Sequence, residues 1–385
     1  MIRDHAFLRE LVAMKDEVGV VSLYVTADPR LEASVKPGWE ILLRNELESL
    51  REQVSGWPDR MRRATVLEHL QGLEPDIEQL VDPSQSGLGR ALFAPVCTDE
   101  VHRTTLQVPV GTSAVFESTA YVRPMVSAMA TSAPACVAVV SRDGVRLIDY
   151  RYGQAEDVYE STFALDTDDW RRMRGPGAAN TSQQASMQVD KFQRRVEENL
   201  TRYLHSVAPE ISGRVIGLHW TDVLLVGDAK VTAKLAEALH PLEVVQIDKI
   251  IDGLTAPEVV AYISDALAHV RVRRDVSLIQ RAKDAALAGG RGSLGLGQTL
   301  SLLNEGRVDC LLLDEMGVWR GGRGPDGRLY PAGQVPPGVE AVDEPDLGER
   351  MIERALESSA EVTILQREAA ADLADHDGVA ALLRW

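Results

Sequence analysis

The side chains of this chain that are best suited to bind a ligand are those of Lys and Arg residues that cluster in one stretch of the sequence. From Trp170 to His205, seven Lys and Arg residues stand against three acids. Guanidinium and ammonium groups bind phosphate oxygens, so such a cluster is typical of contact with a nucleic-acid backbone. A solvated helix face would explain the same charges. We favour phosphate contact because a polar segment without large apolar side chains lies inside the stretch, from Gly175 to Gln184.

Two elements would present these cations: a loop predicted over residues 171–186 and the helix that follows it. A connection of this length inside a compact domain is usually functional or disordered. The candidate contact residues of the loop are Arg171, Arg172, Arg174, Gly175, Pro176, Gly177, Asn180, Thr181, Gln183 and Gln184. Those of the helix, expected on backbone phosphates, are Lys191, Arg194 and Arg195.

The signatures of common hydrolases, metalloproteases and nucleotide-binding enzymes are missing from the sequence. Three glycines, Gly292, Gly295 and Gly297, lie between two predicted helical segments instead of after a strand, which favours a structural turn over a nucleotide site. Asp314 and Glu315 end a predicted strand without a His, Lys or metal-ligand partner nearby in sequence. This context favours a solvated strand end over a catalytic pair. We therefore predict no catalytic residues, no metal site and no cofactor.

The chain as a whole is acidic, with 41 Lys and Arg against 58 Asp and Glu and a formal net charge of −17. Taken alone, this charge argues against a general polyanion-binding protein. The charges are unevenly placed, however. Six acids and no base lie between Glu156 and Asp169, whereas residues 271–291 hold six Lys and Arg against two acids. Because salt screens charges beyond roughly 8 Å, distant acids leave such basic patches able to bind RNA.

Three domains of mixed class, α+β first and α/β afterwards, account for the length of the chain. The first domain, residues 1–132, contains a β-branched strand at Val18–Thr26. Two helices follow, the second with apolar residues at helical spacing from Leu67 to Leu80. Strand-like segments at Ala91–Val96 and Thr105–Val110 close the domain.

The second domain, residues 133–274, holds the basic stretch. Asp143 and Gly144 between two β-rich runs predict a hairpin. Apolar residues at spacings of three and four from Val189 to Val207 predict one long amphipathic helix. The third domain, residues 275–385, contains an irregular insertion rich in Gly and Pro from Gly317 to Pro345.

Three cysteines are spread along the chain, at Cys97, Cys136 and Cys310. An odd number of widely separated cysteines excludes a disulfide scaffold and a zinc finger, and it fits a reducing compartment. No apolar run approaches the roughly 20 residues that cross a bilayer. We expect a cytoplasmic protein.

Two C-terminal segments carry a resemblance to a known family. They are Gly306–Asp314 (Gly-Arg-Val-Asp-Cys-Leu-Leu-Leu-Asp) and Gly378–Trp385 (Gly-Val-Ala-Ala-Leu-Leu-Arg-Trp), and Val21–Val25 adds a weaker N-terminal match. With the order of the domains, they make the chain resemble the archaeo-eukaryotic release factor and Pelota superfamily. Its bacterial branch, which includes Balon-like ribosome hibernation factors, is the more similar. The resemblance implies three domains, with an RNase H-like central domain and an L7Ae-like C-terminal domain.

The resemblance also implies a monomeric, tRNA-shaped protein that occupies the A site of the 70S ribosome and contacts 16S and 23S rRNA. The first domain would face the decoding centre, where Arg30 and Lys36 are the candidate contacts by position and charge. The loop of the central domain would point toward the peptidyl-transferase centre. The third domain would face a translational GTPase, in this branch elongation factor Tu.

One departure from the release factors decides the predicted activity. Their Gly-Gly-Gln motif is replaced here by Gly175-Pro176-Gly177, with Gln183 and Gln184 well separated from it, and no Asn-Ile-Lys-Ser stop-codon motif occurs. Pro176 fixes φ and removes an N–H where a glycine would leave the backbone free. We predict a hibernation or stress factor that does not hydrolyse peptidyl-tRNA. The alternatives are a peptidyl-tRNA hydrolase that uses Gln183 or Gln184, and an interaction adaptor that does not bind ribosomes.

Overall fold

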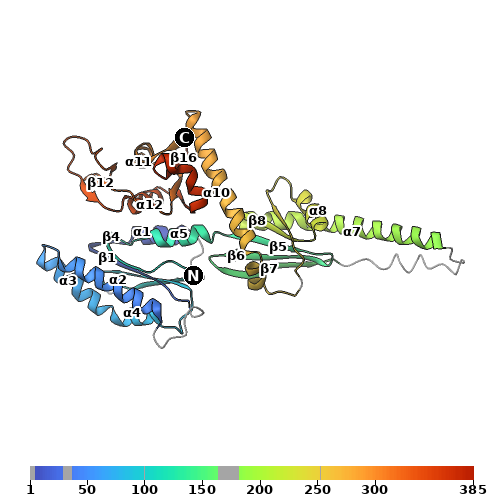
Figure 1. Ribbon diagram of the computed structural model, residues 1–385, viewed down its shortest axis with the longest axis horizontal. Helices are drawn as coiled ribbons and strands as arrows, with labels where there is room; N and C mark the ends of the chain where they lie inside the picture. The colour runs from blue at the N-terminus through green and yellow to red at the C-terminus, as the bar shows by residue number, and fades with distance from the viewer. Residues whose placement is uncertain (1–4, 29–36, 99, 164–181, 252) are drawn as a thin grey trace. The chain divides into compact units, whose positions relative to one another are not determined.

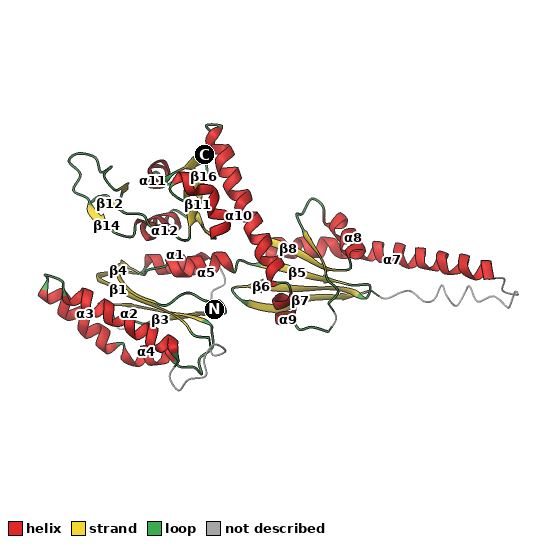
Figure 2. Cartoon of the chain, viewed as in Figure 1, coloured by secondary structure: helices red, strands yellow, loops and turns green. Residues whose placement is uncertain are grey.

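The computed structural model describes residues 5–28, 37–98, 100–163, 182–251 and 253–385 (Figures 1 and 2). The chain divides into two compact units. The larger unit joins Met1–Ser132 to Val272–Trp385, and the smaller unit is Ala133–Arg271. Helices and β-sheets alternate in both, so the predicted mixture of α+β and α/β architecture is confirmed.

The N-terminal sheet of the larger unit is antiparallel, with the strand order β3-β2-β1-β4. Its strands are β1 (Lys15–Thr26), β2 (Gly89–Pro95), β3 (His102–Leu106) and β4 (Ser113–Thr119). β1 is buried at every position from Val20 to Val25, because helices cover both faces of the sheet at this point. The sequence pattern missed β4, whose side chains are mostly half-buried and show no clear alternation.

Three helices cover one face of this sheet, namely α2 (Gly38–Ser55), α3 (Arg60–Gly72) and α4 (Glu74–Val81) (Figure 1). In α2, the buried Leu43, Leu47, Leu50 and Val54 recur at spacings of three and four and pack against β1. The single helix predicted from Leu67 to Leu80 is wrong. The chain forms two helices here, because Pro75 cannot donate a backbone hydrogen bond and fits only the first turn of a new helix.

Two further helices, α1 (His5–Ala13) and α5 (Arg123–Thr131), lie on the other side of the sheet (Figure 2). The side chains of two β1 residues hold the chain just before α5. Ser22 Oγ accepts a hydrogen bond of 3.0 Å from the N–H of Tyr121, and the Tyr24 hydroxyl donates one of 2.6 Å to the Tyr121 carbonyl. The start of α5 is thus tied to the centre of the sheet.

A second sheet of the larger unit has the order β10-β16-β11-β15. Its strands are β10 (Gly292–Leu294), β11 (Val308–Asp314), β15 (Glu361–Leu365) and β16 (Val379–Leu383). β11 pairs parallel with β15 and antiparallel with β16. The accompanying helices are α11 (Leu296–Asn304), α12 (Leu347–Glu357), α13 (Arg367–Ala370) and the 3-10 helix η1 (Ala371–His376).

The prediction of an irregular segment from Gly317 to Pro345 is wrong in part. This segment contains a small sheet with the order β13-β12-β14. The strands are β12 (Gly321–Arg323), β13 (Leu329–Pro331) and β14 (Val342–Glu344). Each has three residues, which is too short to produce a readable alternation. Gly321 lets β12 approach closely, since a Cβ there would collide with the carbonyl of Tyr330.

The smaller unit is built on a five-stranded sheet with the order β7-β6-β5-β8-β9. The strands are β5 (Ala135–Val140), β6 (Gly144–Arg151), β7 (Gln154–Thr162), β8 (Asp222–Gly227) and β9 (Val245–Asp248). The hairpin predicted at Asp143 and Gly144 is confirmed as the turn between β5 and β6. β8 and β9 continue the sheet in parallel with β5, which agrees with the RNase H-like order that the resemblance implied.

Helices cover both faces of this sheet. One face carries α7 (Ser182–Gly217) and α8 (Ala229–Leu239), which bury Leu204, Ile211 and Leu235 against β5 and β8. The other carries α9 (Ala256–Tyr262) and the beginning of α10 (Ser264–Leu287). α10 continues past Arg271, the last residue of the unit, without a break.

A charged cluster lies inside the larger unit and is centred on Arg350 of α12, whose side chain is 3% exposed. Its guanidinium donates to the Glu353 carboxylate at 2.6 Å, to Glu117 at 2.7 Å and to Glu344 at 3.1 Å. It also donates to the Thr119 hydroxyl at 3.2 Å. α12, β4 and β14 thereby share one cation. Burial raises the pKa of Glu117, and the charge of Arg350 opposes this shift.

We predict that Arg350→Met destabilises the protein by about 3–5 kcal/mol, because it leaves buried carboxylates without their shared cation. The free energy of unfolding at pH 7 would be measured by urea titration. Arg328→Met is the matched control, since Arg328 and Asp326 form an exposed pair, and its effect should stay within about 0.5 kcal/mol. Equal effects of the two substitutions would contradict this role of Arg350.

Candidate nucleic-acid interface

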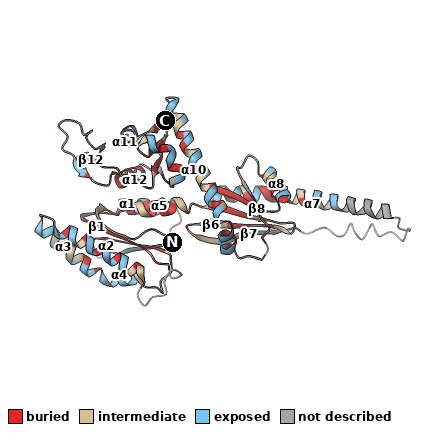
Figure 3. Ribbon diagram, in the orientation of Figure 1, coloured by how far each residue is buried: buried red, intermediate tan, exposed pale blue. Residues whose placement is uncertain are grey.

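The outer part of α7 carries cations beyond the core of the smaller unit. α7 has 36 residues, which at 1.5 Å per residue gives a length of roughly 54 Å. Among its described side chains, those from residues 193 to 199 are exposed or half-buried, and Leu200 is the first buried one. Figure 3 colours the described residues of α7 by burial. Arg194 and Arg195 lie on these outer turns and are exposed.

The inner part of α7 anchors this extension. Leu200, Leu204 and Ile211 are buried against the sheet, and the Tyr203 hydroxyl donates a 2.7 Å hydrogen bond to the carbonyl of Ser161. Of the amphipathic face predicted from Val189 to Val207, the described side chains of Leu200, Leu204 and Val207 are buried in the core. A helix held firmly at one end can present the side chains of its other end to a partner without a large ordering cost.

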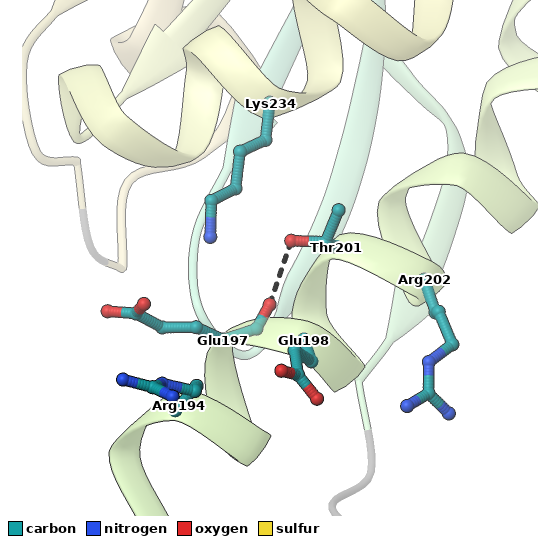
Figure 4. A pocket seen from close by; sticks show the side chains of 6 residues that line it. All are labelled: Arg194, Glu197, Glu198, Thr201, Arg202 and Lys234. Carbon is teal, nitrogen blue, oxygen red and sulfur yellow. Dashed lines mark hydrogen bonds between the residues drawn. The ribbon is translucent and has the colours of Figure 1, made fainter. Parts of the chain in front are cut away.

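An open notch of about 440 Å³ lies beside α7 (Figure 4). The residues that line it are Arg194, Glu197, Glu198, Thr201 and Arg202 of α7 and Lys234 of α8. The sequence drew attention to the α7 cations but missed Lys234. Its place 32 residues after Arg202 gives no local signal, and only the packing of α8 along α7 brings the two cations to one notch.

The start of α8 fixes the position of Lys234. The Asp228 carboxylate caps the helix by accepting a 2.9 Å hydrogen bond from the Lys230 N–H. Gly227 lets β8 end close to β5, because a Cβ at this position would collide with the carbonyl of Val140. Leu235 is buried, so its neighbour Lys234 lies at the edge of the core, half-buried and beside α7.

The cations of the notch are available to a ligand. In the described part of the chain, no ion pair involves Arg194, Arg202 or Lys234. Glu197 and Glu198 make the lining mixed, with one more positive than negative charge. The Thr201 hydroxyl is occupied by a 2.8 Å hydrogen bond to the Glu197 carbonyl (Figure 4). Such point charges suit phosphate groups and carry no base specificity.

Most of the predicted contact residues lie outside the described residues. They are Arg30, Lys36, Arg171, Arg172, Arg174, Gly175, Pro176, Gly177, Asn180 and Thr181. Gln183, Gln184 and Lys191 belong to the part of α7 that is described as backbone only. The prediction that the loop extends to residue 186 is wrong, since α7 begins at Ser182. No Gly or Pro occurs between Ser182 and Lys191, so nothing in this sequence opposes a helix.

Two cations of the second basic cluster, residues 271–291, are engaged in contacts within the chain. Arg271 donates a 2.8 Å hydrogen bond to the carbonyl of Ala133 and lies over the Tyr150 ring. Arg274 pairs with the buried Asp275 at 3.3 Å. Arg271 and Arg274 therefore serve the packing of α10, whereas Arg273, Arg281 and Arg291 of the same cluster are exposed.

The glycine motif begins at Gly292, between the helices α10 and α11 as predicted, but it also contains a short strand. Its first three residues form strand β10 and Gly295 is the N-cap of α11, which is a suitable setting for phosphate at a helix N-terminus. That N-terminus is already occupied, because the Asp377 carboxylate accepts a 3.1 Å hydrogen bond from the Leu296 N–H. A second anion would be repelled there.

Asp314 and Glu315 also have structural contacts. Asp314 accepts a hydrogen bond from the Met316 N–H, and Glu315 accepts one of 3.1 Å from the Ser127 hydroxyl. Over the described ranges, no group of three His, Cys, Asp or Glu side chains could hold a metal ion. Within the same ranges, no helix is long and apolar enough to span a membrane.

The smaller unit matches a known protein family. Residues 134–264, which include α7, α8 and the notch, match the model of "Bacterial archaeo-eukaryotic release factor family 5". This confirms the predicted resemblance to bacterial archaeo-eukaryotic release factors for the central domain. The assignment to the Balon-like branch stays a prediction. No curated protein matches the chain.

Solved structures show more distant similarities. An archaeal translation termination factor is 16% identical, with 99% of this chain and 96% of that chain covered and a TM-score of 0.24. Pelota of Archaeoglobus fulgidus is 12% identical, with coverages of 77% and 79% and a TM-score of 0.30. A model of ribosome-bound archaeal Pelota is 14% identical, with coverages of 100% and 95% and a TM-score of 0.41. These identities and TM-scores are too low to assign a function.

We predict that Arg202→Glu combined with Lys234→Glu weakens binding of a single-stranded RNA oligonucleotide by about tenfold or more at low salt, regardless of its sequence. The slope of log affinity against log salt should fall by about 0.7 for each lost phosphate contact. Lys230→Glu is the control, because Lys230 is an exposed cation of α8 outside the notch. An unchanged salt slope in the double variant would show that the notch binds no phosphate.

Proposed function

Because the central domain is a bacterial archaeo-eukaryotic release factor-like domain, we propose that this protein binds ribosomes. In this proposal it occupies the A site of idle or stalled 70S ribosomes as a hibernation or stress factor. It blocks the site as a mimic of tRNA or a release factor and does not hydrolyse peptidyl-tRNA.

The observation that carries the proposal is the cationic extension of α7. Arg194 and Arg202, with Lys234 from α8, line a notch on the helix that follows the basic stretch at Arg171. The remaining surface is dominated by acids, since the net charge is −17. RNA is attracted to such a protein only at its basic sites, which favours docking in one orientation over general RNA binding.

The absence of hydrolysis is proposed from the sequence of the loop. Gly-Gly-Gln is not present, and no hydroxyl or thiol paired with a neighbouring general base takes its place near Gly175-Pro176-Gly177 in the sequence. Gln183 and Gln184 belong to the first turn of α7. Helical φ and ψ angles give a glutamine there less backbone freedom than adjacent glycines would provide.

The proposed partners follow the same arrangement. The outer part of α7 and the segment before it would contact 23S rRNA, and the N-terminal domain would approach 16S rRNA at the decoding centre through Arg30 and Lys36. The C-terminal domain would receive a translational GTPase, which we propose to be elongation factor Tu. A ribosome-bound archaeal Pelota is among the similar structures.

Ribosome pelleting tests the proposal. The purified protein should co-sediment with vacant 70S ribosomes at about 0.15 M salt, and simultaneous change of Arg171, Arg172 and Arg174 to Glu should abolish this binding. The control changes Arg44, Arg60 and Arg328 to Glu, which alters the net charge equally outside the central domain. Wild-type protein that folds normally and stays in the supernatant would support the interaction adaptor and exclude our proposal.

The hydrolase alternative is tested on ribosomes that carry labelled peptidyl-tRNA. We expect the rate of peptide release with the protein to equal the rate without it. Release that disappears on Gln183→Ala or Gln184→Ala would establish the hydrolase instead. Gln193→Ala, on an exposed outer turn of α7, is the matched glutamine control.

A further inference from the structure

The first turn of α5 lacks a capping side chain of its own. Its N-cap residue is Val122, which has no side-chain acceptor, and Pro124 in the first turn has no N–H. The N–H groups of Val122 and Arg123 still need acceptors, because unpaired buried donors are costly. Both are satisfied by a residue from another part of the chain.

That residue is Glu349 of α12. Its Oε1 accepts a 2.6 Å hydrogen bond from the Val122 N–H, and its Oε2 accepts one of 2.9 Å from the Arg123 N–H. The side chain is fully buried. A carboxylate that accepts two backbone N–H groups at a helix N-terminus performs the task of an N-cap, here from more than 220 residues away in the sequence.

Neighbouring contacts hold the same two segments together. Asp346, the N-cap of α12, accepts hydrogen bonds from the Tyr121 hydroxyl at 2.9 Å and from the Arg123 guanidinium at 3.1 Å. Arg123 also donates to the carbonyl of Gly317 at 2.6 Å and lies over the Trp319 ring. Residues 121–123 therefore contact both α12 and the segment that precedes β12.

The cap is held in an unfavourable environment for a carboxylate. Burial, followed by the charge of Glu353, raises the pKa of Glu349, while the hydrogen bond from Val122 and the charge of Arg350 lower it and favour the ionised form that accepts both N–H groups. The buried Glu349 carboxylate depends on the N–H groups of Val122 and Arg123 as its hydrogen-bond donors. Loss of either donor would leave a buried acceptor poorly satisfied, so the contact is made as a unit or not at all.

We propose that Glu349 is a latch between α12 and α5, which caps α5 only while α12 is docked on the N-terminal segment. Movement of α12 would leave the first turn of α5 uncapped and free to unwind. α5 ends at Thr131, two residues before the smaller unit starts at Ala133. A partner that shifts α12 would in this way loosen the first turn of α5, the helix that leads into the smaller unit.

Hydrogen exchange measured by mass spectrometry on the full chain tests the latch. Glu349→Ala should accelerate exchange of the amides from residue 122 to residue 131 by roughly fivefold or more, as expected for a lost cap. Because coupling is reciprocal, the amides of α12 should also exchange faster. Those of α2, which Glu349 does not contact, should keep their wild-type rates.

Asp59→Ala is the matched control. Asp59 caps its own helix, α3, by accepting hydrogen bonds from Met61 and Arg62. Its removal should accelerate exchange in α3 and leave α5 and α12 unchanged. If Glu349→Ala does not fold, Glu349→Gln, which keeps one acceptor, should give a smaller acceleration confined to α5 and α12. Wild-type exchange of α5 in a folded variant, or equal acceleration throughout the larger unit, would overturn the proposal.

Discussion

The buried cation Arg350 is the interaction on which the architecture of the larger unit depends. Its guanidinium neutralises carboxylates from β4, β14 and α12, three elements that lie up to 236 positions apart in the sequence. A buried charge pair has a large desolvation cost, and only the convergence of several partners offsets it. The elements must therefore come together in one arrangement, because any other leaves an unpaired charge in the interior.

This constraint explains why the two ends of the chain form one unit. The N-terminal sheet and the C-terminal sheet each have an apolar core of their own. Apolar burial alone is non-directional and fixes no unique docking of one on the other. The hydrogen bonds that Arg350 donates to Glu117 and that Glu349 accepts from the Val122 N–H define one docking, because they are satisfied only in one register of α12.

In the smaller unit, by contrast, charged side chains lie outside the apolar core. The inner half of α7 buries leucines at helical spacing, while Arg194 and Arg195 on the turns before Leu200 lie in exposed positions. Packing residues and exposed cations therefore lie on different turns of the same helix. The turns from Leu200 onward pack against the sheet, and in our proposal the exposed cations before them contact rRNA.

The sequence by itself determined the local features: the hairpin at Asp143, the helical spacing around Leu204 and the basic stretch from Arg171 onward. These follow from side-chain types a few positions apart, which periodicity reveals. Only the tertiary structure decided that Lys234 joins Arg202, that Arg271 and Arg274 serve packing, and that Glu349 caps α5. Such contacts depend on which surfaces pack together. The free energy that selects them comes from burial and pairing across long sequence separations, and no local pattern records it.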